Sequence, residues 1–173
     1  MTTLETERLI IRPWRREDRP ALARMARDAE MMRYVTRGQT WSDEAIDQML
    51  ERQRRHLTQH GVCFGATALK ASGEVIGVVG MQQLDNGDFE LGWWVWKDYW
   101  GRGFATEAAS AYVEYARHVM GLSSLVAVID PPNIASKVVA ARLGLRCERI
   151  MNARRTISRR DNEPIALYRI RFQ

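Results

Sequence analysis

A glycine-rich loop, Trp100-Gly-Arg-Gly-Phe-Ala-Thr-Glu107, is the part of this sequence whose residue types point most directly to chemistry. It lies between an apolar run that predicts a strand and an alanine-rich run that predicts an amphipathic helix. Gly101 and Gly103 let a ligand approach the main chain, and the free N–H groups at the start of a helix attract anions. The loop therefore fits a phosphate, to which Arg102 and Thr106 could add side-chain contacts. A loop of this kind also occurs as a plain connection between a strand and a helix.

Two other kinds of phosphate loop fit the spacing less well. A Walker loop needs Gly-Lys followed by Ser or Thr, which the sequence lacks. A Rossmann fingerprint would take its three glycine positions from Gly101, Gly103 and Thr106, and Asp130 would then be the acid that binds a ribose. The third glycine is missing, and the preceding strand follows an Asn-Gly hairpin, whereas a Rossmann strand begins a parallel unit. The Rossmann interpretation is disfavoured and stays open.

The elements that must position this loop follow from periodicity and turn signals. Asn86-Gly87 between apolar runs predicts a hairpin within an antiparallel meander, and the later part of the chain alternates strand, helix, strand and helix. We therefore expect an α/β fold with a mixed, mostly antiparallel sheet flanked by helices. The expected strands span residues 9–13, 64–70, 74–84, 89–96, 124–129, 146–157 and 165–172, with the last two joined through Asp161-Asn162. The expected helices span residues 17–29, 105–120 and 134–143, with one more between a Ser42 cap and Gly61.

Length and composition limit the class of protein. A chain of 173 residues and 20.0 kDa fits a single domain over residues 1–173. Its apolar runs are too short to cross a membrane, and its first residues lack the apolar region of a secretory signal, so we expect a cytoplasmic protein. Cys63 and Cys147 stand far apart and are interpreted as packing residues. His56 and His60 share a helix face, but no further ligand is evident, so we expect surface residues and no metal site.

The net charge of +5 is concentrated near the carboxyl end of the chain. Arginines and one lysine gather in residues 137–171, downstream of the glycine-rich loop. A local basic patch of this kind can bind a phosphorylated ligand or a nucleic acid. The chain lacks a recognisable nucleic-acid motif, so nucleic acid is an unlikely partner.

Four stretches taken in order resemble the GNAT acetyltransferases, and within them the RimJ/RimL-like branch. The opening residues 5–14, the strand Glu90-Leu-Gly-Trp-Trp-Val95, the loop 100–107 and the segment 133–145 match almost from end to end. Trp100 departs from the Gln or Arg that usually begins this family's loop, but it is similar to a Trp-Gly variant of this branch. The resemblance implies a GNAT-like fold over residues 1–173, with the sheet splayed around acetyl-CoA.

The resemblance also implies how acetyl-CoA is bound. Its pyrophosphate would lie on the backbone amides of the loop, and its pantetheine arm would lie beside the central strand, where that strand parts from strand 124–129. Asn133 would contact this arm, and it also fits a helix cap or an Asx turn. The implied cofactor-binding residues are Trp94, Val95, Trp96, Gly101, Arg102, Gly103, Phe104, Ala105, Thr106, Asn133 and Ser136.

The catalytic candidates come from the same resemblance. Glu90 is the acid within the central strand and matches the position of a general base in many GNAT enzymes. Ser136 matches a serine proposed in RimL-like enzymes to protonate the leaving sulfur. Ala140 stands where many members carry a tyrosine, and Arg155 stands where RimL-like enzymes carry a glutamate. Glu90 also fits a solvated or ion-paired residue, and Ser136 a structural first-turn serine.

Several tryptophans surround the candidate site. Alternation along a strand places Trp93 on the face opposite Trp94 and Trp96, so one set can pack in the core while the other stacks on an acceptor. Trp41 and residues 34–40 fall where this family places an acceptor-binding loop.

Together these features predict an acetyl-CoA-dependent N-acetyltransferase. The acceptor would be a primary amine, either the α-amino group of a protein N-terminus or a small amine, attacking directly in a ternary complex. The unmatched tyrosine and glutamate leave a catalytically weak acyl-CoA-binding module or sensor as the alternative. Exposed strand edges at a splayed sheet are compatible with a homodimer.

Overall fold

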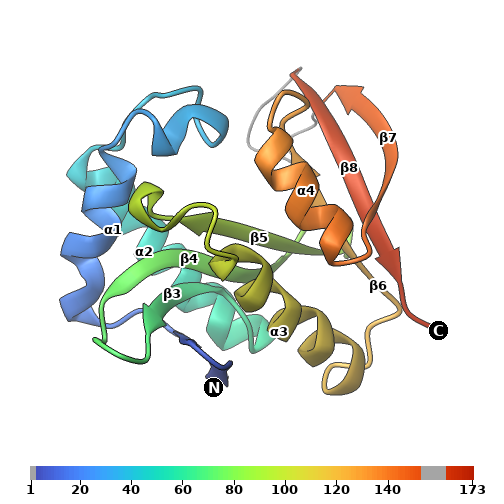
Figure 1. Cartoon of the computed structure of the whole chain (residues 1–173), viewed down its shortest axis with the longest axis horizontal. Coiled ribbons are helices and arrows are strands. Elements are labelled where there is room, and N and C mark those ends of the chain that lie inside the picture. The colour runs from blue at the N-terminus through green and yellow to red at the C-terminus, as the bar shows by residue number, and fades with distance from the viewer. Residues whose placement is uncertain (1–2, 153–162) are drawn as a thin grey trace.

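The computed structural model describes residues 3–152 and 163–173, which form eight strands and four α-helices (Figure 1). The strands are β1 (Leu4–Glu5), β2 (Leu9–Arg12), β3 (Phe64–Leu69), β4 (Val75–Gln83), β5 (Phe89–Val95), β6 (Ser124–Ile129), β7 (Arg146–Asn152) and β8 (Pro164–Arg171). The helices are α1 (Arg19–Ala26), α2 (Asp43–His60), α3 (Phe104–His118) and α4 (Ile134–Arg142). Three short 3-10 helices are η1 (Arg16–Asp18), η2 (Met31–Tyr34) and η3 (Lys97–Tyr99).

All eight strands belong to one sheet in the order β1-β2-β3-β4-β5-β6-β8-β7. Neighbouring strands are antiparallel except for β5 and β6, which run parallel. The β5–β6 ladder holds a single register pair, Glu90 with Val126, so the two strands part from this point onward. The predicted mixed, mostly antiparallel sheet and its separation at β6 are confirmed.

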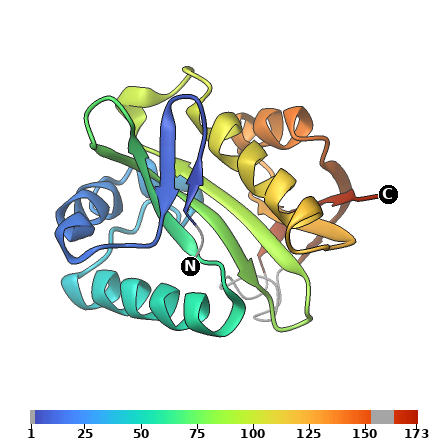
Figure 2. The same cartoon turned by 90° about the horizontal axis from the view of Figure 1, so that it is seen from below.

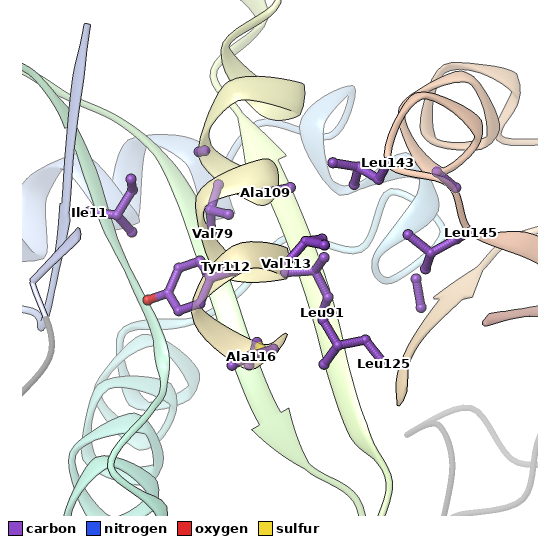
Figure 3. Close-up of a cluster of buried hydrophobic side chains, with 14 of the residues drawn as sticks. Ile11, Val79, Leu91, Ala109, Tyr112, Val113, Ala116, Leu125, Leu143 and Leu145 are labelled. Carbon is purple, nitrogen blue, oxygen red and sulfur yellow. The ribbon is translucent and has the colours of Figure 1, made fainter. Parts of the chain in front are cut away.

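Helices cover both faces of the sheet (Figure 2). On one face, α3 lays a stripe of small and aromatic side chains on β4 and β5, and α4 continues this layer beside β6 (Figure 3). On the other face, α1 and α2 pack on β3 and β4. The α3 stripe follows the helical period that the sequence showed: Ala108, Ala109, Tyr112, Val113 and Ala116.

Local signals set the ends of α2 as predicted. The Ser42 side chain accepts a hydrogen bond from the Ala45 N–H at 3.2 Å, which caps the first turn. Gly61 ends the helix with a φ of 74°, a left-handed conformation that favours glycine. This helix therefore has the boundaries that its capping residues specify.

Other boundaries differ from the prediction. The segment expected as one helix over 17–29 begins as η1, because Asp18 turns back to bind the Arg12 guanidinium at 2.6 and 2.9 Å. The central strand ends at Val95 rather than Trp96, and η3 follows it. The expected turn through Asp161-Asn162 lies outside the described residues.

Two further points concern composition. Cys63 is buried as expected, but Cys147 is exposed on the edge strand β7, so its interpretation as a packing residue was wrong. Within residues 3–152 and 163–173, no helix is both long and apolar enough to cross a membrane.

Candidate active site

A cleft of about 820 Å³ opens where β5 and β6 separate. Its walls come from η2 and the loop after it, from α2, from the β4–β5 hairpin and from the start of α4. Of the predicted site residues, it brings together Glu90, Trp94, Asn133 and Ser136. Val95, Trp96 and the glycine-rich loop do not belong to its lining.

The glycine-rich loop lies at the start of α3 and has the conformation that a phosphate loop needs. Gly101 and Gly103 have φ values of 72° and 80°, which side chains with a Cβ rarely adopt. Gly103 is the N-cap of α3 and offers no side chain to the first N–H groups of the helix. These amides are therefore available to an anion, and the helix dipole favours one there.

Aromatic contacts connect this loop to the end of β5. The Trp100 indole N–H donates to the Val95 carbonyl at 2.6 Å. The Arg102 guanidinium lies 5.2 Å from the Tyr99 ring and 5.3 Å from the Phe104 ring. The loop is thus fixed to the strand that lines the cleft.

The amino-terminal segment holds the other side of the loop. Glu107, in the first turn of α3, accepts hydrogen bonds from the Thr6 hydroxyl at 2.5 Å, the Arg8 backbone N–H at 2.9 Å and the Arg8 side chain at 2.6 Å. Arg8 also covers the Phe104 ring at 4.2 Å. Sequence reasoning missed these contacts, although an acid in the first helical turn was a visible signal for a partner.

Glu90 lies in the cleft with a hydrogen bond but without an ion pair among the described residues. Its carboxylate accepts a bond from the Gln82 amide at 2.6 Å, across the β4–β5 ladder. Burial raises the pKa of Glu90 to about 7, and the Gln82 bond opposes part of that rise. The side chain is half-buried, so a ligand in the cleft can reach it. A carboxyl with this pKa can accept a proton near neutral pH.

Asn133 and Ser136 lie at the opposite side of the cleft, in the first turn of α4. The Asn133 side chain caps this helix by accepting a hydrogen bond from the Ser136 N–H at 3.1 Å. Asn133 is thus the helix cap expected as one of its two roles. Because Ser136 is half-buried and lines the cleft, the cap also holds a hydroxyl there.

The tryptophans divide between the two faces of the sheet, as alternation predicted. Trp93 packs against the core beneath α3, whereas Trp94 and Trp96 pack against the opposite core. In the cleft, the Trp41 and Trp94 rings meet edge to face at 5.5 Å. Trp96 instead lies under the Arg24 guanidinium at 4.8 Å.

His56 is part of the cleft wall, so its interpretation as a surface residue was wrong. Its Nε2 accepts the Gln83 N–H at 2.8 Å, and its Nδ1 therefore donates to the Val62 carbonyl at 2.8 Å. Burial, more than any other cause, lowers the pKa of His56, and the ring stacks on His60 at 4.4 Å. The residue joins α2 to β4 as a neutral imidazole. No His, Cys, Asp or Glu cluster among the described residues could hold a metal.

Gln82 is a further member of the site that sequence reasoning did not find. Its signal was the Asn-Gly hairpin, which places the end of β4 opposite the start of β5. The loop length that decides which residue faces Glu90 is visible only in the structure.

Comparison with known proteins gives the same class that the fold and cleft indicate. Residues 8–146 match the Acetyltransferase (GNAT) domain family, so the chain belongs to the GNAT acetyltransferases. It is 30% identical over 146 residues to the uncharacterized N-acetyltransferase p20 of Bacillus licheniformis, covering 79% of this chain and 78% of that protein. An acetyltransferase structure from Agrobacterium tumefaciens strain C58 superposes with a TM-score of 0.83 at 27% identity, covering 99% and 95% of the two chains.

The fold is also shared with RimL, a ribosomal L7/L12 alpha-N-protein acetyltransferase whose structure was determined in complex with coenzyme A. That structure superposes with a TM-score of 0.79 at 18% identity, covering 99% of this chain and 98% of RimL. The predicted GNAT family is confirmed by the family match, whereas the RimJ/RimL-like branch stays a prediction. The protein is an acetyl-CoA-dependent N-acetyltransferase.

Proposed function

We propose that the protein transfers an acetyl group to a primary amine, with Glu90 as the general base. The acceptor is the α-amino group of a protein N-terminus or a small amine, and it attacks directly in a ternary complex. The observation that carries this proposal is a carboxyl with a pKa of about 7 inside the cleft formed by the parting of β5 and β6.

The residues at the start of α3 and around the gap between β5 and β6 fit an acetyl-CoA donor. Acetyl-CoA supplies an acetyl thioester and a pyrophosphate. The amides from Arg102 to Thr106 would hold the pyrophosphate, because the left-handed glycines leave the start of α3 uncapped by a side chain. Trp94 and Asn133 would hold the pantetheine arm, since both line the gap between β5 and β6. An arm that carries amides can bind an exposed strand edge as a peptide does.

Glu90 and Ser136 would divide the proton transfers. An α-amino group has a pKa near 8 and a lysine side chain near 10.4, so an acceptor needs a base that works close to neutral pH. Glu90 would accept the proton that the amine loses as nitrogen bonds to the acetyl carbon. Ser136 would give a proton to the sulfur as the carbon–sulfur bond breaks, and its hydroxyl would regain one from solvent.

The test is release of free thiol from acetyl-CoA in the presence of a panel of amines and N-terminal peptides. Wild type should turn over at least one acceptor class. Glu90→Gln should lower kcat by about 100-fold or more, the usual contribution of a general base, with little change in coenzyme A affinity. Tight coenzyme A binding without turnover of any acceptor would contradict the proposal and favour an acyl-CoA-binding module.

The glycine-rich loop is tested separately by coenzyme A binding. Gly103→Val should weaken binding, because a β-branched residue strains the φ of 80° and displaces the first amides of α3. Gly61→Val is the matched control, since Gly61 has a φ of 74° and open space around it but lies at the far end of α2. Equal coenzyme A affinity in the two variants would contradict the role of the loop. The homodimer and the cytoplasmic location expected from the sequence stay predictions.

A further inference from the structure

Arg52 lines the cleft but has no role in the proposed acetyl transfer. It lies on the face of α2 that turns toward the sheet, one helical turn before His56. His56 binds the Gln83 backbone, and the neighbouring Gln82 binds Glu90. Arg52 and Glu90 therefore line the same cleft from facing elements.

The Arg52 side chain has an unused donor. Its Nε is buried and has no hydrogen-bond partner within the described part of the chain. Elsewhere in that part, guanidinium groups at comparable depth are bound to carboxylates, as Arg12 is to Asp18 and Arg169 is to Asp88. A buried guanidinium N–H without an acceptor is unfavourable, and Arg52 lines the cleft with no ion pair among the described residues, so its positive charge is available to an anion that a ligand brings.

The other charges in the cleft indicate where each end of a ligand would lie. Arg37 also lines the cleft, but its Nε is 3.3 Å from the Glu163 carboxylate. Glu90 and Asp85 line the hairpin side, Asp130 lines the end of β6, and these acids favour an ammonium group. Positive charge on α2 and negative charge on the hairpin suit a ligand that carries both an amine and an anion.

We propose that Arg52 binds a carboxylate of the acceptor, so that preferred acceptors are amines that also carry a carboxylate. This inference rests on the proposed function for the position of the amine. The carboxylate has two possible sources, the α-carboxylate of an amino acid or an acidic side chain near a protein N-terminus. The Trp41 and Trp94 rings on the cleft wall suit an apolar body between the two charges.

The first experimental arm uses L-phenylalanine and 2-phenylethylamine, which differ by the carboxylate. Arg52→Gln should lower kcat/KM for phenylalanine by about tenfold or more, the value of one charge-assisted hydrogen bond, and leave 2-phenylethylamine nearly unchanged. Arg52→Lys should restore part of the loss, because it keeps the charge without the planar fork of donors. Comparing each amine between variants removes the effect of its own basicity.

The second arm distinguishes the source of the carboxylate. Two hexapeptides with the same free N-terminal serine carry Glu or Gln at their second position. Selective loss of the Glu peptide in Arg52→Gln would identify an acidic side chain as the ligand, and selective loss of phenylalanine would identify an α-carboxylate. Arg55→Gln is the matched control, because Arg55 is exposed on the same helix.

A binding measurement separates this inference from the proposed function. Calorimetry of 3-phenylpropionate, which has the ring and carboxylate without the amine, should show binding to the coenzyme A-loaded wild type and about tenfold weaker binding to Arg52→Gln. Arg52-dependent binding without acetylation of any amine would support the anion site and contradict the proposed function. Absence of Arg52 dependence in both kinetic pairs and in calorimetry would overturn the inference. A preference of the wild type for 1,5-diaminopentane over phenylalanine, strengthened in Arg52→Gln, would also overturn the inference.

Discussion

Glu90 is held in a state that suits proton transfer and opposes stability at alkaline pH. Its pKa is 4.5 in an unfolded chain and about 7 when folded, because burial disfavours the carboxylate. Because the folded pKa lies above the unfolded one, the protonated Glu90 side chain contributes stability that is fully present below about pH 4.5. This contribution is lost as the pH rises through 7. The residue that we propose as the base therefore destabilises the fold at the pH where it is active.

Glu90→Gln should for this reason stabilise the protein while it removes activity. At pH 8 we expect the free energy of unfolding to rise by roughly 2 to 3 kcal/mol, and at pH 4.5 to change little. Urea unfolding of wild type and variant at the two pH values measures the difference. Glu7→Gln, at an exposed position, should give a small change at both. A gain that is equal at pH 4.5 and pH 8 would show that the ionisation of Glu90 is not its source.

Gln82 should set the pH at which Glu90 becomes active. Its amide donates to the Glu90 carboxylate at 2.6 Å and so lowers the pKa that burial raises. Gln82→Met keeps the length of the side chain but removes the donor, so the acid limb of kcat/KM should move to higher pH. A pH–rate profile checks the shift, with Gln59→Met on the exposed face of α2 as control. An unmoved acid limb would mean that Gln82 does not act on the base.

At the scale of elements, most of the fold could be predicted, and the register of the hairpin could not. A two-residue Asn86-Gly87 turn would pair Gln83 with Glu90. The structure instead has a three-residue loop, in which Gly87 adopts a φ of 88° and the Leu84 N–H donates to the Asp88 carbonyl at 2.8 Å. A shift of one residue moves every side chain to the other face. The partner of Glu90 thus depends on a detail that composition does not encode.

The same limit applies to elements without a periodic signal. Ser42 and Gly61 are local signals and marked α2 correctly, whereas η2 has no such mark. η2 and the loop after it form one wall of the cleft and pack there through tertiary contacts. Because this wall of the cleft could not be predicted, the sequence places His56 and Arg52 on α2 but does not show that they face a site.

The caps of α2 and α4 allow a comparison of stability with function. Asn133→Ala and Ser42→Ala each remove a hydrogen bond to a helical N–H, so each should lower the free energy of unfolding by about 1 kcal/mol. Only Asn133→Ala should also lower kcat/KM for acetyl-CoA, because the α4 cap lines the cleft and holds Ser136 there. Asn133→Asp should recover the stability, since Asp also caps helices. Equal kinetic losses in the two alanine variants would reduce the role of Asn133 to general stability.

At the scale of the whole molecule, the parting of β5 and β6 that opens the cleft also leaves the two parts of the sheet joined by little backbone pairing. A side-chain link from β8 to the β4–β5 hairpin crosses this division. Arg169 on β8 binds both Asp88 carboxylate oxygens at 2.9 and 3.0 Å, at the start of the β4–β5 hairpin's return strand, and it also binds Glu148 and Ser124. The basic surplus near the carboxyl end is therefore used in part for structure.

Arg169→Met should lower the free energy of unfolding by an amount that depends on pH. The hydrogen bond from Arg169 is the main cause that lowers the pKa of Asp88 in the folded protein. The ion pair therefore stabilises the fold fully at pH values above 3.8, the ordinary pKa of an aspartate. This stabilisation is lost as the pH falls through the lowered pKa of Asp88. We expect a loss of about 1 to 3 kcal/mol at pH 7, measured by urea unfolding, that shrinks below about pH 4. Arg171→Met, which removes an exposed partner of Glu148, should lose less than about 1 kcal/mol. A difference between Arg169→Met and wild type that stays constant from pH 7 to pH 3 would assign the loss to packing of the arginine stem instead of its ion pair with Asp88.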